Sequence, residues 1–378
     1  MAQPGRNESC WCGSGLKYKR CHLHRENQAP ESKFDIRKKF FALSKQRFCF
    51  CGFDAERCSS VLASSHSISK SGSLKLIAER SHVAAIKGDF GFVDGVQSYF
   101  DSLRIAEISI NKASTFGGFC EFHDAKLFAE LDRLYFRDRS IFFWQLVYRA
   151  AAYEKYQKIV AVDFTDQVRL LDKGASLAEL QRVQFHANFQ KWSHGEGLKN
   201  INILLNGIED AYQAQAFDRI SYCYFLTDRR LPFAGLGFFQ PSMTMDGWSL
   251  QRVNLVFSHE LFRSSPLSES VCIAAIPMKG STLLCLCCLR HQSRSKEFIE
   301  SIRGSGKVVS LFLGAMMLSI ENVYFTPSYL RRLSDESLSL LKRLSSLGIA
   351  EDVRQSDVVL ARSVSLFDDV AVIEREAS

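Results

Sequence analysis

The sequence predicts a multidomain α+β protein, and three observations support this prediction. Cysteine and histidine are concentrated in the first third of the chain, where residues 1–123 hold seven of the 12 cysteines and five of the 9 histidines. No proline occurs between Pro30 and Pro232, which favours long helices in the middle of the chain. From about residue 219, short stretches rich in β-branched and aromatic residues are typical of strands.

The positive charge of the chain lies at its N-terminus. Residues 1–47 carry eleven Lys and Arg against four acids, which accounts for the whole net charge of +7 over 378 residues. A localised basic segment is where an anionic partner such as nucleic acid would bind. The alternative is a solvated basic arm without a partner.

The N-terminus and the apolar segments predict a cytoplasmic protein with no membrane contact. The opening residues MAQPGRNESC contain no apolar segment of the kind that directs secretion, so we expect the thiols to stay reduced. The longest apolar run, 308–320, has thirteen residues, whereas a membrane span needs about 20. This run is therefore predicted to be a buried helix.

The first candidate metal site lies at 10–22. Cys10-x-Cys12 and the adjacent pair Cys21-His22 provide four zinc ligands within thirteen positions. Gly13-Ser14-Gly15 lets the backbone turn sharply between the two pairs. So short a peptide cannot bury a core, and metal binding would supply its folding free energy.

Residues 5–24 resemble the SEC-C motif, the zinc-binding tail of SecA-like translocation ATPases that also occurs on other bacterial proteins. The matching residues are Arg6-Asn7, Cys10, Cys12-Gly13-Ser14-Gly15, Lys17-Tyr18-Lys19 and Cys21-His22, while Trp11 stands where the family usually has proline. The resemblance implies zinc ligation by Cys10, Cys12, Cys21 and His22. It also implies a bacterial protein in which this module docks onto a protein or ribosomal partner.

A second candidate zinc site combines Cys51, Cys58, Cys120 and His123, with Cys49 as a spare. Cys120 and His123 lie at the start of a predicted helix, where residues three apart share a face. A ligand pair on a knuckle followed by a pair in the first turn of a helix is the treble-clef arrangement. The alternative is that these cysteines are core residues, since 61 residues separate Cys58 from Cys120.

The segment SSHSISKS resembles the catalytic segment of HNH nucleases, which are built on a treble clef. The resemblance implies that His66 is the general base that activates water for phosphodiester cleavage, with a divalent cation such as Mg²⁺ or Mn²⁺ bound nearby. Ser65 stands where the family has a metal-binding acid, and His82 and Asp124 are candidate substitutes. The alternatives are a degenerate fold that binds nucleic acid without cutting it, and a structural His66 that caps a helix or satisfies a core polar group.

The middle of the chain is predicted to be helical. Apolar residues at three- and four-residue spacing predict helices at 124–136 and 140–160. Ser176 and Glu179 form a capping box that opens a further helix to about Lys191. The glycines at 195 and 197 predict a break before another helix that reaches Ile208, so that the two form a hairpin.

The C-terminal half is predicted to be an antiparallel sheet with helices. The predicted strands are SYCYFLT, PFAGLGFFQP, RVNLVFS, SVCIAAIPM and STLLCLCCL. Lys279-Gly280 forms the predicted turn between the last two. Cys285, Cys287 and Cys288 lie in an apolar strand and are predicted to be core residues. Helices are expected again within 307–325 and 335–348.

Together these features predict four regions and two alternative functions. The regions are a SEC-C-like zinc module (1–26), an HNH-like or treble-clef zinc region (34–136), a helical region (137–218) and an α+β domain (219–378). The first hypothesis is a protein with one or two zinc ions that binds and cleaves nucleic acid through its N-terminal half. The second is a non-enzymatic adaptor that docks through the SEC-C-like module, with purely structural zinc.

Overall fold

The computed structural model describes residues 4–88, 100–134, 138–250, 269–347 and 353–377. It divides into two compact units. The first unit contains Met1–Gln46 and Lys155–Asn202, and the second contains Arg47–Glu154 and Ile203–Ser378. The two longest helices, α7 (Arg139–Val168) and α8 (Leu177–Gln213), each have residues in both units.

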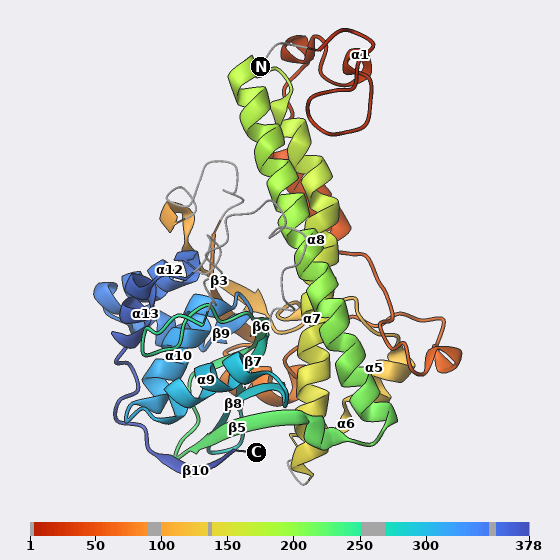
Figure 1. Cartoon of the computed structure of the whole chain (residues 1–378). Coiled ribbons are helices and arrows are strands. Elements are labelled where there is room, and N and C mark those ends of the chain that lie inside the picture. The colour runs from red at the N-terminus through yellow and green to blue at the C-terminus, as the bar shows by residue number, and fades with distance from the viewer. Residues whose placement is uncertain (1–3, 89–99, 135–137, 251–268, 348–352, 378) are drawn as a thin grey trace. The chain divides into compact units, whose positions relative to one another are not determined.

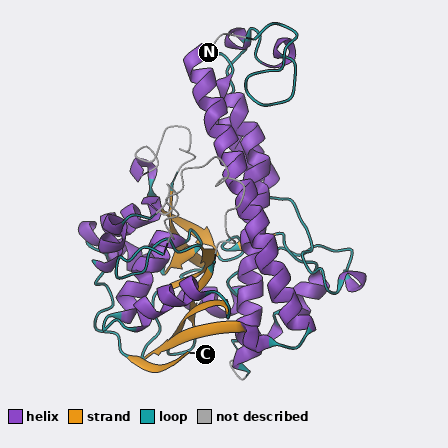
Figure 2. Cartoon of the chain, in the orientation of Figure 1, coloured by secondary structure: helices purple, strands orange, loops and turns teal. Residues whose placement is uncertain are grey.

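The first unit is helical. It holds α1 (Tyr18–Cys21), the 3₁₀ turn Arg25–Asn27 and α2 (Lys33–Leu43), together with parts of α7 and α8 (Figures 1 and 2). The 3₁₀ turn Arg169–Asp172 connects α7 to α8. The backbone N–H of Glu179 donates to Ser176 Oγ at the start of α8, as predicted.

The predicted break at the glycines of 195 and 197 is wrong, because α8 is one continuous helix of 37 residues. A Cβ on Gly197 would lie 3.1 Å from Lys158 Cε of α7, an atom near the flexible end of a lysine side chain, and Gly195 has no neighbouring atom within 4 Å. The predicted helical hairpin is therefore made by α7 and α8 rather than by two halves of α8.

The second unit contains an eight-stranded sheet and a two-stranded sheet, both antiparallel. The strand order of the large sheet is β10-β5-β8-β7-β6-β9-β2-β3, and the small sheet pairs β1 with β4. The strands are β1 (Ser65–His66), β2 (His82–Lys87), β3 (Arg104–Ser109), β4 (Thr115–Phe116), β5 (Ile220–Thr227), β6 (Phe233–Phe239), β7 (Val271–Pro277), β8 (Thr282–Leu289), β9 (Val323–Phe325) and β10 (Val372–Ala377). The predicted strand RVNLVFS lies outside the described residues.

The turn between β7 and β8 forms where the sequence predicts it. Gly280 adopts a positive φ of 84°, a conformation that favours glycine, and the N–H of Met278 donates to the carbonyl of Ser281. The three cysteines of β8 are buried as predicted.

Alternate residues of β5 face opposite sides of the large sheet. On one side, the ring of Tyr222 stacks on Phe143 of α7, with centroids 4.2 Å apart.

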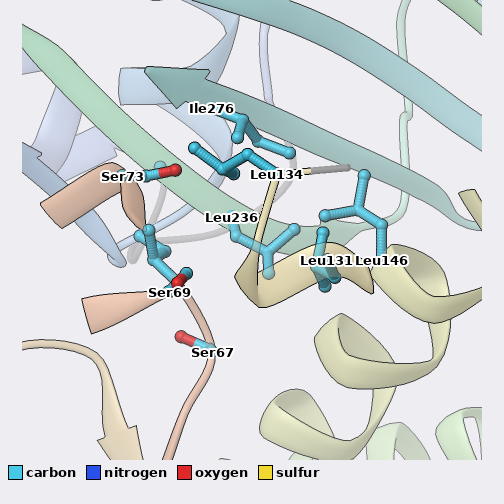
Figure 3. A pocket seen from close by; sticks show the side chains of 10 residues that line it. Ser67, Ser69, Ser73, Leu131, Leu134, Leu146, Leu236 and Ile276 are labelled. Atoms are coloured by element: carbon cyan, nitrogen blue, oxygen red, sulfur yellow. The ribbon is translucent and has the colours of Figure 1, made fainter. Parts of the chain in front are cut away.

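The π-helical turn Lys70–Leu74 and the following α3 (Lys75–Ile77) precede β2. A small cavity lies between Ser69, Leu236 and Ile276 (Figure 3), with a volume of about 10 Å³. This volume is enough for about one water molecule.

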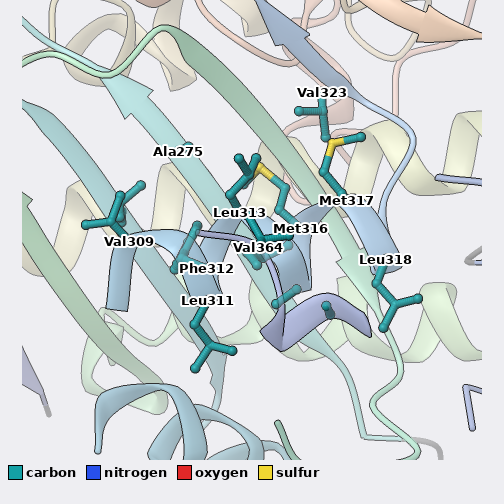
Figure 4. Close-up of a cluster of buried hydrophobic side chains, with 14 of the residues drawn as sticks. Ala275, Val309, Leu311, Phe312, Leu313, Met316, Met317, Leu318, Val323 and Val364 are labelled. Atoms are coloured by element: carbon teal, nitrogen blue, oxygen red, sulfur yellow. The ribbon is translucent and has the colours of Figure 1, made fainter. Parts of the chain in front are cut away.

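The other side of the sheet holds the main hydrophobic core. Cys223 and Phe225 join a buried cluster that includes Phe312 and Met316 of α10 (Figure 4). A Cβ on Gly314 would lie 2.1 Å from the carbonyl oxygen of Ala361, so α10 and α13 approach closely. The helices of the C-terminal half are α9 (Ser293–Arg303), α10 (Val308–Ser319), α11 (Pro327–Arg332), α12 (Asp335–Leu347) and α13 (Gln355–Arg362).

Candidate metal centres and the His66 segment

The first ligand cluster lies in the first unit. The ligand atoms of Cys10, Cys12, Cys21 and His22 lie within 4.8 Å of one another. Cys10 Sγ is 3.2 Å and Cys21 Sγ 3.1 Å from His22 Nδ1, and the sulfurs of Cys12 and Cys21 are 3.5 Å apart. The edges of a zinc tetrahedron with such ligands measure about 3.5 to 3.8 Å. The sulfur–sulfur distance matches such an edge and the two distances to Nδ1 are slightly shorter, so the four predicted residues are brought together in an arrangement that could hold zinc.

The local backbone explains how two ligand pairs converge. Gly13 and Gly15 adopt positive φ values of 78° and 73°, which turn the chain after the first pair. The N–H of Cys10 donates to the carbonyl of Leu16 and closes this turn. The short helix α1 follows at once and carries the second pair at its end.

Residues distant in sequence hold the ligand His22. Its Nε2 lies 2.7 Å from Asp172 Oδ2, which leaves Nδ1 facing the thiols. Asp172 is fully buried and also accepts hydrogen bonds from Arg25 and Gln184. Burial raises the pKa of Asp172, but the hydrogen bonds from His22 and Arg25 outweigh burial and lower it overall. A carboxylate behind a metal-binding histidine fixes its tautomer and strengthens it as a ligand.

Replacing Asp172 with asparagine should therefore weaken zinc binding at the first cluster. The expected loss of affinity is about 10- to 100-fold, measured by competition with a chromophoric chelator. Asp163→Asn is the matched control, because Asp163 is exposed on α7 and accepts a hydrogen bond from Gln46. Equal affinities of Asp172→Asn and the unchanged protein would show that the carboxylate does not support the site.

The second ligand cluster lies in the second unit and consists of Cys49, Cys58, Cys120 and His123. His123 Nδ1 lies 3.4 Å from Cys49 Sγ, 3.6 Å from Cys58 Sγ and 3.2 Å from Cys120 Sγ. Three of the four predicted ligands are brought together. The fourth position belongs to Cys49, which the sequence offered as a spare, and the buried Cys51 lies outside the group.

Backbone pairing joins the segments that carry this second cluster. The N–H groups of Phe48 and Phe50 donate to the carbonyls of Gly117 and Gly118, and the N–H of Ala63 donates to the carbonyl of Phe119. The chain from 117 to 119 thus runs between the two segments that carry Cys49 and Cys58. Helix α5 (Glu121–Leu127) begins directly after Cys120 and places His123 in its first turn; α6 (Ala129–Asp132) follows.

The two clusters have the same types of ligand, and in both of them the Nδ1 atom of the histidine faces the thiols. Each has three thiols and one histidine Nδ1, a closed set typical of structural rather than catalytic zinc. Asp54 Oδ2 lies 3.5 Å from His123 Nε2, in the place that Asp172 occupies behind His22, although the Nε2 atom makes no hydrogen bond there. Both clusters are therefore able to hold zinc.

Each cluster pairs one thiol of raised pKa with one of lowered pKa. Burial raises the pKa of Cys10 and of Cys49 to about 12. Burial also raises that of Cys12, but the interactions of this thiol with His22 and Ser14 outweigh it and bring the pKa to about 6. In Cys120, backbone N–H groups of His123 and Ser59 overcome burial and lower the pKa to about 6. One thiolate in each cluster is thus available to metal at neutral pH.

The candidate base His66 lies on β1, which pairs with β4 just before the second cluster's helix. Its Nδ1 is 3.0 Å from the carbonyl oxygen of Ala113. The half-buried ring has a pKa below its usual value, mainly because of burial, with Lys70 and Arg149 acting in the same direction. The predicted helix cap is made by Ser69 instead, whose Oγ accepts from the N–H of Gly72.

The predicted substitutes for the missing acid occupy different positions. Asp124, on α5, interacts electrostatically with His66, and its buried Oδ1 atom has no hydrogen-bond partner. His82 is exposed at the start of β2, where its Nδ1 contacts the carbonyl oxygen of Arg80. Within the described ranges no third group of metal-ligating side chains includes His66, and the cavity of Figure 3 beside this segment is too small for a substrate.

Comparison with known proteins identifies one motif. Residues 6–23 match the SEC-C motif, which includes all four ligands of the first cluster. No curated protein and no solved structure matches the chain. Among the helices that the structure describes, none is long and apolar enough to cross a membrane.

Proposed function

We propose that this protein binds nucleic acid and cleaves it hydrolytically, with His66 as the general base and both zinc ions in structural roles. The observation that supports His66 most directly is its contact with Ala113. A carbonyl oxygen accepts only from a protonated Nδ1, so this contact leaves the lone pair on Nε2. The lowered pKa of His66 keeps the ring neutral at neutral pH.

The proposed step is an in-line hydrolysis. Nε2 of His66 accepts a proton from water, the water oxygen bonds to phosphorus, and the bond from phosphorus to the leaving oxygen breaks. A divalent cation would neutralise charge on the phosphate. Asp124, whose charge acts on His66, is the carboxylate that would contribute to holding it. The side chain of Lys70, whose charge acts on His66, is exposed and able to approach a phosphate.

The second cluster would position this chemistry without taking part in it. The pairing of β1 with β4 between the segment of Cys49 and Cys58 and the helix α5 supports a treble-clef-like arrangement, into which β2 and β3 are inserted between the two paired strands. Zinc bound by four protein ligands has no open position for water, which supports a structural role. The basic N-terminal segment supports an anionic substrate.

The test is cleavage of plasmid DNA and of single-stranded DNA and RNA by the purified chain with Mg²⁺ or Mn²⁺. His66→Ala should reduce the rate at least 100-fold at unchanged zinc content, since a positioned base contributes about 10²- to 10⁴-fold. His291→Ala serves as the control, because His291 is an exposed histidine in the turn after β8. Equal cleavage by His66→Ala and the unchanged protein would rule out His66 as the base.

The adaptor function is the second candidate, favoured by the surface of the SEC-C-like module. Leu16 is half exposed, and the basic residues Arg6, Lys17, Lys19 and Arg20 are exposed as well. An apolar residue with basic neighbours suits a protein or ribosomal partner. Absence of cleavage and of binding to nucleic acid, together with association with a protein that Leu16→Ala weakens, would favour this function over the first.

A further inference from the structure

One face of helix α2 carries aromatic and basic side chains in alternation. The opposite face contains the buried Ile36, and the ring of Phe40 contacts Phe164 of α7 at 5.1 Å, so the helix is anchored by that side. Phe34, Lys38, Phe41 and Lys45 follow at helical spacing on the outer side, with Lys45 in the turn after the helix. We call these four residues the α2 outer face.

The two phenylalanines of this face are unusually exposed. Phe34 is 75% and Phe41 is 50% exposed, although burial of such a ring would be favourable. The guanidinium of Arg37 lies 5.6 Å from the centre of the Phe41 ring and adds a positive charge beside it. Asp35 is the acidic residue of this helix. At the start of the helix its carboxylate accepts a hydrogen bond from Ser32 Oγ, and its backbone N–H donates to the same oxygen.

We propose that the α2 outer face binds single-stranded nucleic acid, with bases stacked on Phe34 and Phe41 and phosphates paired with Lys38 and Lys45. This inference deepens the nucleic-acid part of the proposed function and does not depend on cleavage by His66. Exposed aromatic rings combined with lysines are the means by which proteins bind single strands without sequence preference. The charge of residues 1–47 is complementary to such a partner.

The spacing of the rings supports a single strand. Phe41 lies seven positions after Phe34, which corresponds to about 10 Å along the helix axis. Stacked nucleotides rise by about 3.4 Å, so the two rings would contact bases about three nucleotides apart. In a duplex the base faces are already stacked on one another, and the rings would find no partner.

The order of side chains argues against a membrane surface. Helices that lie in a membrane interface separate an apolar face from a cationic face. Here Lys38 lies between Phe34 and Phe41 along one stripe, so the rings form no continuous apolar face. An acidic peptide would explain the lysines but not the two exposed rings.

The experiment measures binding of a fluorescent 12-nucleotide single strand to the full-length chain by anisotropy, without divalent cations so that no cleavage occurs. Phe34→Ala and Phe41→Ala should each weaken binding about tenfold, while affinity for a duplex stays unchanged. Lys38→Gln and Lys45→Gln should each reduce the slope of log affinity against log salt by about 0.7. Phe185→Ala is the control for the rings, because Phe185 is 76% exposed on α8.

Each outcome decides the proposal. A loss of single-strand affinity in the two phenylalanine variants but not in Phe185→Ala supports it, whether or not the protein cleaves nucleic acid. Unchanged affinity in both phenylalanine variants overturns it, as does equal weakening of duplex binding. Binding to vesicles with 30% anionic lipid that depends on both rings, without binding to the oligonucleotide, would also overturn it in favour of a membrane surface. Circular dichroism checks that each variant keeps its helices.

Discussion

Replacing Cys12 with alanine should remove one zinc ion per chain and unfold the module at residues 6–23. The buried apolar cluster of this module contains only Cys10, Cys12 and Tyr18, with Trp11, Cys21 and Leu23 partly buried around it. So small a core cannot stabilise the fold, whereas zinc binding supplies on the order of 10 kcal/mol. Zinc is counted by mass spectrometry of the native protein, and unfolding is followed by hydrogen exchange at residues 6–23.

The control for this first prediction is Cys272→Ala. Cys272 is fully buried in β7 and belongs to neither ligand cluster. The Cys272→Ala variant should be less stable because side-chain packing is lost, but it should keep both zinc ions. If Cys12→Ala retained two zinc ions and slow exchange at residues 6–23, the first cluster would not be a zinc site.

Cys49→Ala should remove the other zinc ion, whereas Cys51→Ala should retain both. Zinc at the second cluster would connect three segments of chain at Cys49, Cys58 and the pair Cys120 and His123, so its loss should unfold the β1 and β4 region. Loss of the buried Cys51 thiol should cost only about 1 kcal/mol through packing. Zinc content and the urea midpoint of each variant separate these effects.

This pair of variants tests the ligand directly, since both thiols are removed by the same chemical change two residues apart. Loss of zinc in Cys51→Ala with retention in Cys49→Ala would assign the ligand to Cys51, as first expected from the sequence. Loss of zinc in both Cys49→Ala and Cys51→Ala would indicate that either substitution unfolds the segment that carries the ligand.

Local patterns in the sequence were enough to predict several of the elements, among them the strands β5 to β8 and the helices α7, α10 and α12. The thirteen-residue apolar run became α10, and the Lys279-Gly280 turn joined β7 to β8. The ligands of the first cluster were predictable because all four lie within thirteen residues and glycines mark the turn between them. In each case the determining contacts are close in sequence.

The features that escaped prediction depend on contacts distant in sequence. Cys49 and Cys51 are two residues apart in extended chain, so spacing alone could not say which thiol meets His123. Gly195 and Gly197 cost about 1 kcal/mol each relative to alanine, but the helix α8 continues through both of them. Likewise, nothing local indicated that β2 and β3 extend the sheet formed by strands more than 100 residues later.

The hydrogen bond between His22 and Asp172 can form only late in the synthesis of the chain. The two residues are 150 positions apart, so the thiols and the imidazole leave the ribosome long before the carboxylate does. At about 5 to 20 residues per second, the interval is roughly 8 to 30 s. Zinc bound by the nascent chain in that interval would be held by the four ligands alone, without the carboxylate that strengthens His22 as a ligand. Formation of the hairpin of α7 and α8 would then strengthen zinc binding after the motif itself has been made.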